Sequence, residues 1–177
     1  KTAYEISPRD WSSDVCSSGL GSLERQLAER GLAARACRCD GTDEAAVRTL
    51  VDALVAEAGP PHALVNNAGI TADGLMLKLS ADQWDQVIAA NLRSVFLFAR
   101  QVMPSMMERR SGVILQMSSI SAIKGNVGQT NYAATKAGML GVTRSLSLET
   151  ARFNIRDRKS TRLNSSHEWI SRMPSSA

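Results

Sequence analysis

Apolar residues in the middle of the chain follow two different spacings, which predict alternating helices and strands. Apolar positions three or four residues apart predict helices over residues 23–30, between Thr42 and Gly59, from Ser80 past residue 104, and over about 131–152. Short apolar runs predict strands over residues 33–39, 62–65 and 112–117, and residues 154–156 look like the start of another. This alternation predicts an α/β fold with a Rossmann-like, doubly wound parallel sheet that is truncated at both ends.

Polar residues mark the starts of two of these helices, and one lies in the middle of the longest. Thr42 is expected to cap the helix that ends at Gly59, and Ser80 with Gln83 is expected to form a capping box. Asn91 lies inside the long helix, where an amide is disfavoured unless it has a role. We therefore take Asn91 as a candidate functional residue.

The two ends of the chain differ from the middle. Residues 1–19 contain five serines and residues 157–177 contain six, without helical or strand periodicity. Both segments resemble translated sequencing-adapter read-through, with solvated Ser-rich tails as the alternative. We interpret residues 1–19 and 157–177 as non-native tails and residues 20–156 as a partial domain.

Composition narrows the class of protein. A hydrophobic content of 44% exceeds that of disordered chains, and the net charge of +4 comes from scattered residues instead of a basic stripe, so nucleic acid is not an expected partner. No apolar run is long enough to span a membrane. Three cysteines, without metal-ligand spacing, predict neither a disulfide framework nor a metal site. We expect a cytoplasmic protein that binds no metal.

Candidate chemistry lies on the helix after the strand at 112–117. Tyr132 and Lys136 are four residues apart and share a helix face, where a lysine cation stabilises phenolate and allows proton exchange near neutral pH. Ser119 follows the strand, and its hydroxyl could bond the carbonyl that Tyr132 protonates, because the carboxyl ends of parallel strands form the ligand crevice. Ser118 is more simply structural, whereas Ser121 could also line the site.

A family resemblance rests on four motifs in order. These are Asn66-Asn67-Ala68-Gly69, Asn91, Ser119, and the Tyr132-x-x-x-Lys136 pair. Residues 22–156 resemble the short-chain dehydrogenase/reductase family, and are most similar to 3-oxoacyl-[acyl carrier protein] reductases. The resemblance implies NADPH-dependent reduction of a 3-oxoacyl thioester carried by acyl carrier protein or CoA, with NAD as the other possible cofactor.

The resemblance also implies a role for each residue. Tyr132 would be the general acid, Lys136 would assist it and bond the nicotinamide ribose, and Ser119 would orient the carbonyl. Asn91 would hold a water of the proton relay through its effect on the helix backbone. Asn66, Ala68 and Gly69 would line the cofactor, together with Tyr132 and Lys136, and Asp40 with Gly41 matches the position that contacts adenine. Met139, Leu140, Val142 and Leu146, with the long helix, would contribute to a homotetramer or homodimer interface.

One departure from the family limits these expectations. The sequence has no T-G-x-x-x-G-x-G motif to receive the pyrophosphate at a helix N-terminus, and Gly19 and Gly21 follow no predicted strand. The strand that distinguishes NADP from NAD is also missing. We therefore expect the parent protein to be the enzyme and this chain to be an inactive fragment. The alternatives are another short-chain alcohol, sugar or acetoacetyl-CoA dehydrogenase, or a non-catalytic nucleotide-binding scaffold.

Overall fold

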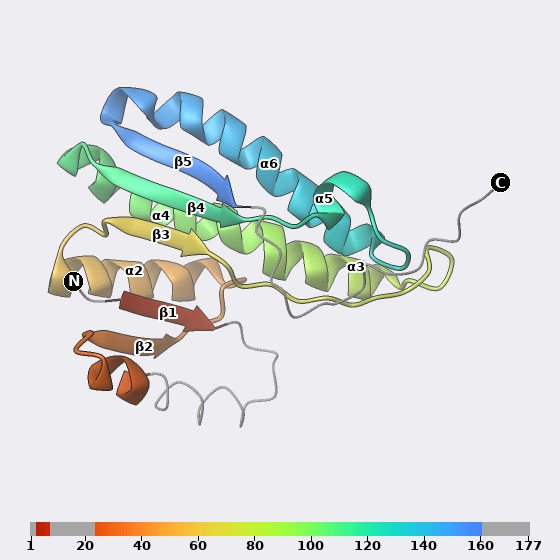
Figure 1. The fold of residues 1–177 in the computed structure, drawn as a ribbon, viewed down its shortest axis with the longest axis horizontal. Coiled ribbons are helices and arrows are strands. Elements are labelled where there is room, and N and C mark those ends of the chain that lie inside the picture. The colour runs from red at the N-terminus through yellow and green to blue at the C-terminus, as the bar shows by residue number, and fades with distance from the viewer. Residues whose placement is uncertain (1–2, 8–23, 161–177) are drawn as a thin grey trace.

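Parallel strands form the centre of the structure. The computed structural model describes residues 3–7 and 24–160. Strand β1 (Ala3–Ser7) pairs with β2 (Ala34–Arg38), and β3 (Ala63–Asn66), β4 (Gly112–Met117) and β5 (Ile155–Ser160) form a second sheet in the order β3-β4-β5 (Figure 1). Every pair is parallel. The predicted α/β class with a parallel sheet is confirmed.

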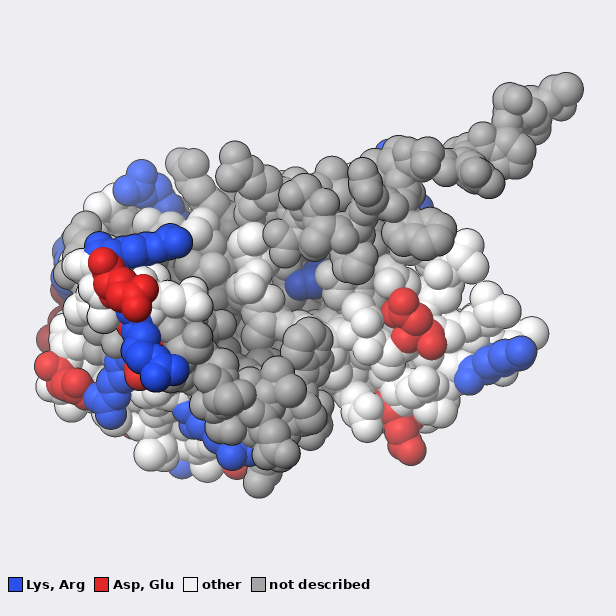
Figure 2. All heavy atoms as spheres, turned by 60° about the horizontal axis from the view of Figure 1, so that its bottom comes forward, with Lys and Arg blue, Asp and Glu red and all other residues white. Residues whose placement is uncertain are grey.

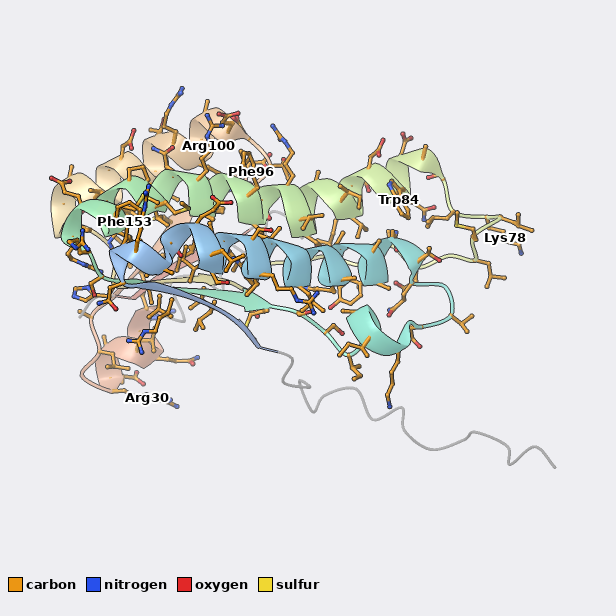
Figure 3. The ribbon with its side chains drawn as sticks, turned by 90° about the horizontal axis from the view of Figure 1, so that it is seen from above. Arg30, Lys78, Trp84, Phe96, Arg100 and Phe153 are labelled. Carbon is orange, nitrogen blue, oxygen red and sulfur yellow. The ribbon has the colours of Figure 1, made fainter. Side chains whose placement is uncertain are left out.

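Helices cover both sides of these strands. The long helices are α2 (Glu44–Ala58), α4 (Ser94–Arg109) and α6 (Thr130–Thr150). They lie on one face, and the helix over residues 24–29 lies on the other (Figure 3). The shorter helices are α3 (Ala81–Ile88), α5 (Ser121–Lys124) and the 3₁₀ turn η2 (Ala151–Phe153). This layering is what the alternating sequence pattern predicts.

One of the two helix caps predicted from the sequence is present in the structure, and the other is formed by the neighbouring residue. The capping box of Ser80 and Gln83 is present at the start of α3. The cap of α2 is Asp43 and not Thr42, because the Asp43 carboxylate accepts hydrogen bonds from the backbone N–H groups of Ala45 and Ala46. The Thr42 hydroxyl instead donates to Asp40 Oδ1 at 2.7 Å. Thr42 and Asp43 are both suitable cap residues, and the hydroxyl of Thr42 is already bonded to Asp40, so Asp43 caps the helix.

The long helix predicted from Ser80 is not a continuous α-helix. A π-helical turn, η1 (Ala89–Arg93), separates α3 from α4 and has Asn91 at its centre. Such turns insert one extra residue into a helix and frequently occur at functional sites. The polar residue that the sequence places in mid-helix is therefore at the point where the helix geometry changes.

The hydrophobic core lies between the sheet and the helices on the α2, α4 and α6 side. It is built from one buried stripe of each element. Its members include Val47, Val51, Phe98, Val102, Met106, Ile114, Leu146 and Ile155. Two of the four α6 residues expected at a subunit interface, Met139 and Leu146, are buried within this chain. Their burial against the sheet accounts for that part of the stripe.

Both ends of the described chain reach into the segments interpreted as tails. Strand β1 lies within residues 1–19 and pairs with β2, and β5 continues four residues past residue 156 to Ser160. Residues 8–23, with Gly19 and Gly21, and residues 161–177 lie outside the described residues. The boundaries at residues 20 and 156 stay predictions.

The described surface is mixed in charge. Among the described residues on the face in Figure 2, basic and acidic side chains are interspersed, and neither sign forms a continuous patch. Within residues 3–7 and 24–160, no helix is long and apolar enough to cross a membrane. In the same part of the chain, no group of three or more His, Cys, Asp or Glu side chains could hold a metal ion.

Candidate active site

The candidate residues lie where parallel strands end. Asp40 and Gly41 follow β2, Asn66 is the last residue of β3, and Ser119 follows β4 by two residues. The arrowheads of β2, β3 and β4 point the same way in Figure 1, so these residues share one edge. Ligands of open parallel sheets bind at this edge, which makes it the candidate active site.

Lys136 is anchored to the end of β4. Its ammonium Nζ donates a hydrogen bond to the carbonyl of Met117 at 2.7 Å, and the Ser118 hydroxyl donates to the carbonyl of Lys136 at 2.8 Å. The same ammonium lies 5.6 Å from the centroid of the Tyr132 ring. The helix spacing of four residues therefore brings the phenol and the ammonium together, and β4 fixes where they lie.

Burial changes the acidity of this lysine. Lys136 is 4% exposed, and loss of hydration lowers the pKa of its ammonium from 10.5 to about 8. Desolvation disfavours the charged form, so the ammonium loses its proton at a lower pH than that of an exposed lysine. Such a shift at a sheet edge is typical of functional sites.

This shift predicts a pH-dependent stability. Between about pH 8 and 10.5 the unfolded chain holds the Lys136 proton and the folded chain has lost it, so the free energy of unfolding rises with pH in that window. The burial penalty is fully present below the folded pKa. In denaturant unfolding of the full-length protein, raising the pH from about 7 to about 9.5 should stabilise wild type by about 2 kcal/mol relative to Lys136→Met. A difference that does not change with pH would contradict the shift.

Asn91 holds the segment that follows β3. Its Oδ1 accepts from the backbone N–H of Ile70 at 2.7 Å, and its Nδ2 donates to the carbonyl of Ile70 at 2.9 Å and to Thr135 Oγ1 at 3.3 Å. A Cβ added at Gly69 would come 3.2 Å from Asn91 Oδ1 and 3.7 Å from Lys136 Nζ. The structure thus brings Gly69, Asn91 and Lys136 together.

The serines after β4 form a local turn. Ser119 is half-buried, and its Oγ accepts from the backbone N–H of Ser121 at 3.2 Å and lies 3.4 Å from Ser121 Oγ. Ser118 is buried and bonded to α6, as described above. Ser119 and Ser121 are therefore the hydroxyls of this loop that lie together, while Ser118 joins β4 to α6.

The remaining candidates lie along the edge with their own protein contacts. The Asp40 carboxylate accepts from the backbone N–H and hydroxyl of Thr42, and a Cβ at Gly41 would come 3.3 Å from the Phe98 ring of α4. Asn66 is buried and donates to Gln116 Oε1 at 2.9 Å, and Ala68 is half-buried. The candidate site therefore extends along the strand ends from β2 to β4. Packing of the Phe98 ring against Gly41 favours a small residue at position 41.

Two buried polar residues of this region were missed by the sequence interpretation. Gln116 lies inside β4 and pairs with Asn66, while its Nε2 atom has no hydrogen-bond partner among residues 3–7 and 24–160. Asn131 is fully buried and donates to the carbonyl of Ala72 at 2.9 Å. A glutamine within an apolar strand is a signal that could have been used. Asn131 has no such signal, because an asparagine at a helix start is common.

Comparison with known proteins places this arrangement in a class. The family model described as short chain dehydrogenase matches residues 9–157. The chain belongs to this family of oxidoreductases, whose members bind NAD or NADP.

Individual relatives agree with this membership. The chain is 46% identical over 112 residues to nodulation protein G of Azospirillum brasilense (63% of this chain and 46% of the relative). It is 44% identical over 115 residues to the 3-oxoacyl-[acyl-carrier-protein] reductase FabG of Thermotoga maritima (65% and 47%). It is 46% identical over 112 residues to the acetoacetyl-CoA reductase of an Acinetobacter species (63% and 45%). The chain spans about half the length of these curated relatives.

Proposed function

We propose that the full protein to which this chain belongs uses NADPH to reduce a 3-oxoacyl thioester, on acyl carrier protein or CoA, to the 3-hydroxyacyl thioester. The observation that carries the proposal is the pairing of Tyr132 and Lys136 beside the end of β4, with the ammonium 5.6 Å from the phenol ring. The names of two relatives described above support the thioester, since those proteins are a 3-oxoacyl-[acyl-carrier-protein] reductase and an acetoacetyl-CoA reductase.

The residues present fit both ends of a nicotinamide dinucleotide. The Lys136 ammonium is a donor suited to ribose oxygens, and a side chain at position 69 would press on Asn91 Oδ1, 3.2 Å from an added Cβ. The Asp40 carboxylate suits an adenine amino group. The sequence has no Gly-rich motif for the pyrophosphate, so these residues account for the nicotinamide and adenine ends of the cofactor.

Each residue then has a defined task. Lys136 and Asp40 would hold NADPH, which when bound would supply a hydride to the carbonyl carbon of the substrate. Tyr132 donates its phenolic proton to the carbonyl oxygen, and the Lys136 ammonium stabilises the phenolate that this leaves. Ser119 donates a hydrogen bond to the same oxygen and orients it. Asn91 holds the Ile70 segment in place, and it would hold a water of the proton relay through its effect on the helix backbone.

The substrate and the cofactor are tested with the full-length protein. We expect oxidation of NADPH with acetoacetyl-CoA and with 3-oxoacyl thioesters of acyl carrier protein, and slower turnover with NADH. Simple alcohols and sugars serve as control substrates. Activity with those controls and none with thioesters would favour another short-chain dehydrogenase, and cofactor binding without turnover on any substrate would favour a non-catalytic scaffold.

We further propose that the full protein is a cytoplasmic homotetramer or homodimer that pairs through α4 and α6. Phe96 on α4 is 52% exposed and Leu148 on α6 is 81% exposed. Arg100 lies over the Phe96 ring and pairs with Glu44 at the start of α2. Exposed apolar residues on two neighbouring helices are the kind of surface that a second subunit covers.

A further inference from the structure

Thr135 connects two candidate catalytic residues from one buried position. It lies directly before Lys136 on α6 and is fully buried. Its hydroxyl donates a hydrogen bond to the backbone carbonyl of Tyr132 at 2.8 Å and accepts one from Asn91 Nδ2 at 3.3 Å. A single hydroxyl therefore joins α6 to η1.

The Asn91 amide depends on this hydroxyl. An amide nitrogen has two N–H donors, and at Asn91 one bonds the carbonyl of Ile70 and the other bonds Thr135 Oγ1. Asn91 is fully buried, so water cannot replace a lost partner without a change in packing. Removal of the Thr135 hydroxyl would leave a buried N–H without an acceptor, which is costly.

A second side chain ties the backbone of Tyr132 to the same loop. Asn131 Oδ1 accepts from the backbone N–H of Tyr132 at 2.7 Å, and Asn131 Nδ2 donates to the carbonyl of Ala72. The N–H of Tyr132 is thus linked to Ala72 through Asn131. Its carbonyl is linked to Ile70 through Thr135 and Asn91.

We propose that Thr135, supported by Asn131, is a positioning residue that fixes the backbone of Tyr132 against the segment following β3. The proposal rests on the proposed function, in which Tyr132 is the general acid. Proton donation needs the phenol within hydrogen-bond reach of the substrate oxygen, so a small displacement of the Tyr132 backbone slows the chemical step more than it weakens binding.

The same helix contains a matched comparison. Thr143 is also buried, and its hydroxyl donates to the carbonyl of Met139 at 2.9 Å, four residues earlier. That bond stays within α6, whereas Thr135 also accepts from η1. A valine at position 143 removes a buried threonine hydroxyl and leaves the Asn91 network intact.

The test compares Thr135→Val, Thr135→Ser and Thr143→Val in the full-length protein. We expect Thr135→Val to lower kcat about tenfold while KM for NADPH and for acetoacetyl-CoA stays within about twofold. Thr135→Ser should keep kcat within about twofold of wild type, because it retains the hydroxyl. Thr143→Val should lower Tm without lowering kcat. Equal kcat in Thr135→Val and Thr143→Val would overturn the proposal.

A second measurement does not depend on turnover. Amide hydrogen exchange followed by NMR should show faster exchange at the Ile70 N–H and the Asn91 side-chain amide in Thr135→Val than in wild type or Thr143→Val. Unchanged exchange would overturn the proposal. If wild type reduces none of the substrates, the proposed function fails, and faster exchange in Thr135→Val still supports the positioning network.

Discussion

Replacement of Tyr132 by phenylalanine in the full-length protein is expected to lower the turnover of a 3-oxoacyl thioester about 10³-fold. The substitution removes the phenolic proton and keeps the ring that lies beside the Lys136 ammonium. Tyr132 is half-buried at the first turn of α6, and its backbone contacts do not involve the hydroxyl. Cofactor affinity and Tm should therefore stay close to those of wild type.

Steady-state kinetics with acetoacetyl-CoA and fluorescence titration with NADPH test this prediction. The kinetic loss should fall on kcat, because the proton is needed in the transition state and not for binding. If Tyr132→Phe retains more than about one tenth of wild-type turnover, the loss of rate is smaller than a general acid usually contributes, and Tyr132 does not have that role.

Loss of the Lys136 ammonium should have the second large effect, and it should act on two quantities. In Lys136→Met we expect kcat to fall about 10²-fold or more and the dissociation constant of NADPH to rise about tenfold. The rate falls because the phenolate loses its neighbouring cation, and the affinity falls because the ribose loses its ammonium donor. Methionine approximates the length of the lysine stem, which limits the packing change.

Lys124→Met is the matched control for this prediction. Lys124 is exposed at the end of α5, the short helix that begins two residues after Ser119. Its replacement removes one positive charge from the same region and leaves the buried ammonium in place. A loss of NADPH affinity equal to that in Lys136→Met would mean that overall charge, and not the Lys136 contact, governs binding.

Much of the fold was predictable because it depends on local pattern. Strand β4 has the predicted bounds Gly112–Met117, since an apolar run between a glycine and two serines has few other solutions. The capping box of Ser80 and Gln83 was also predictable, because both partners lie within one turn. These features require no knowledge of distant residues.

Features set by contacts between distant residues were not predictable. The π-helical turn η1 depends on Asn91 meeting Ile70 and Thr135, which lie 21 and 44 positions away in sequence. The pairing of Asn66 with Gln116 joins residues 50 positions apart. The Tyr132 and Lys136 pair was found because four residues of helix suffice to place it. The assigned roles of these residues stay predictions until the kinetic experiments are done.

The π-helical turn also sets the rotational phase of the helices on either side of it. Val87 before the turn and Met106 after it are both fully buried. Nineteen positions separate them, which in an unbroken α-helix amounts to five revolutions and about 100° more. The extra residue in η1 absorbs about this angle, so both side chains face inward. Deleting one residue from Ala89–Arg93 would leave eighteen positions, which is five full revolutions of a regular α-helix, so both halves of the apolar stripe would still face the core and the turn that holds Asn91 would be lost.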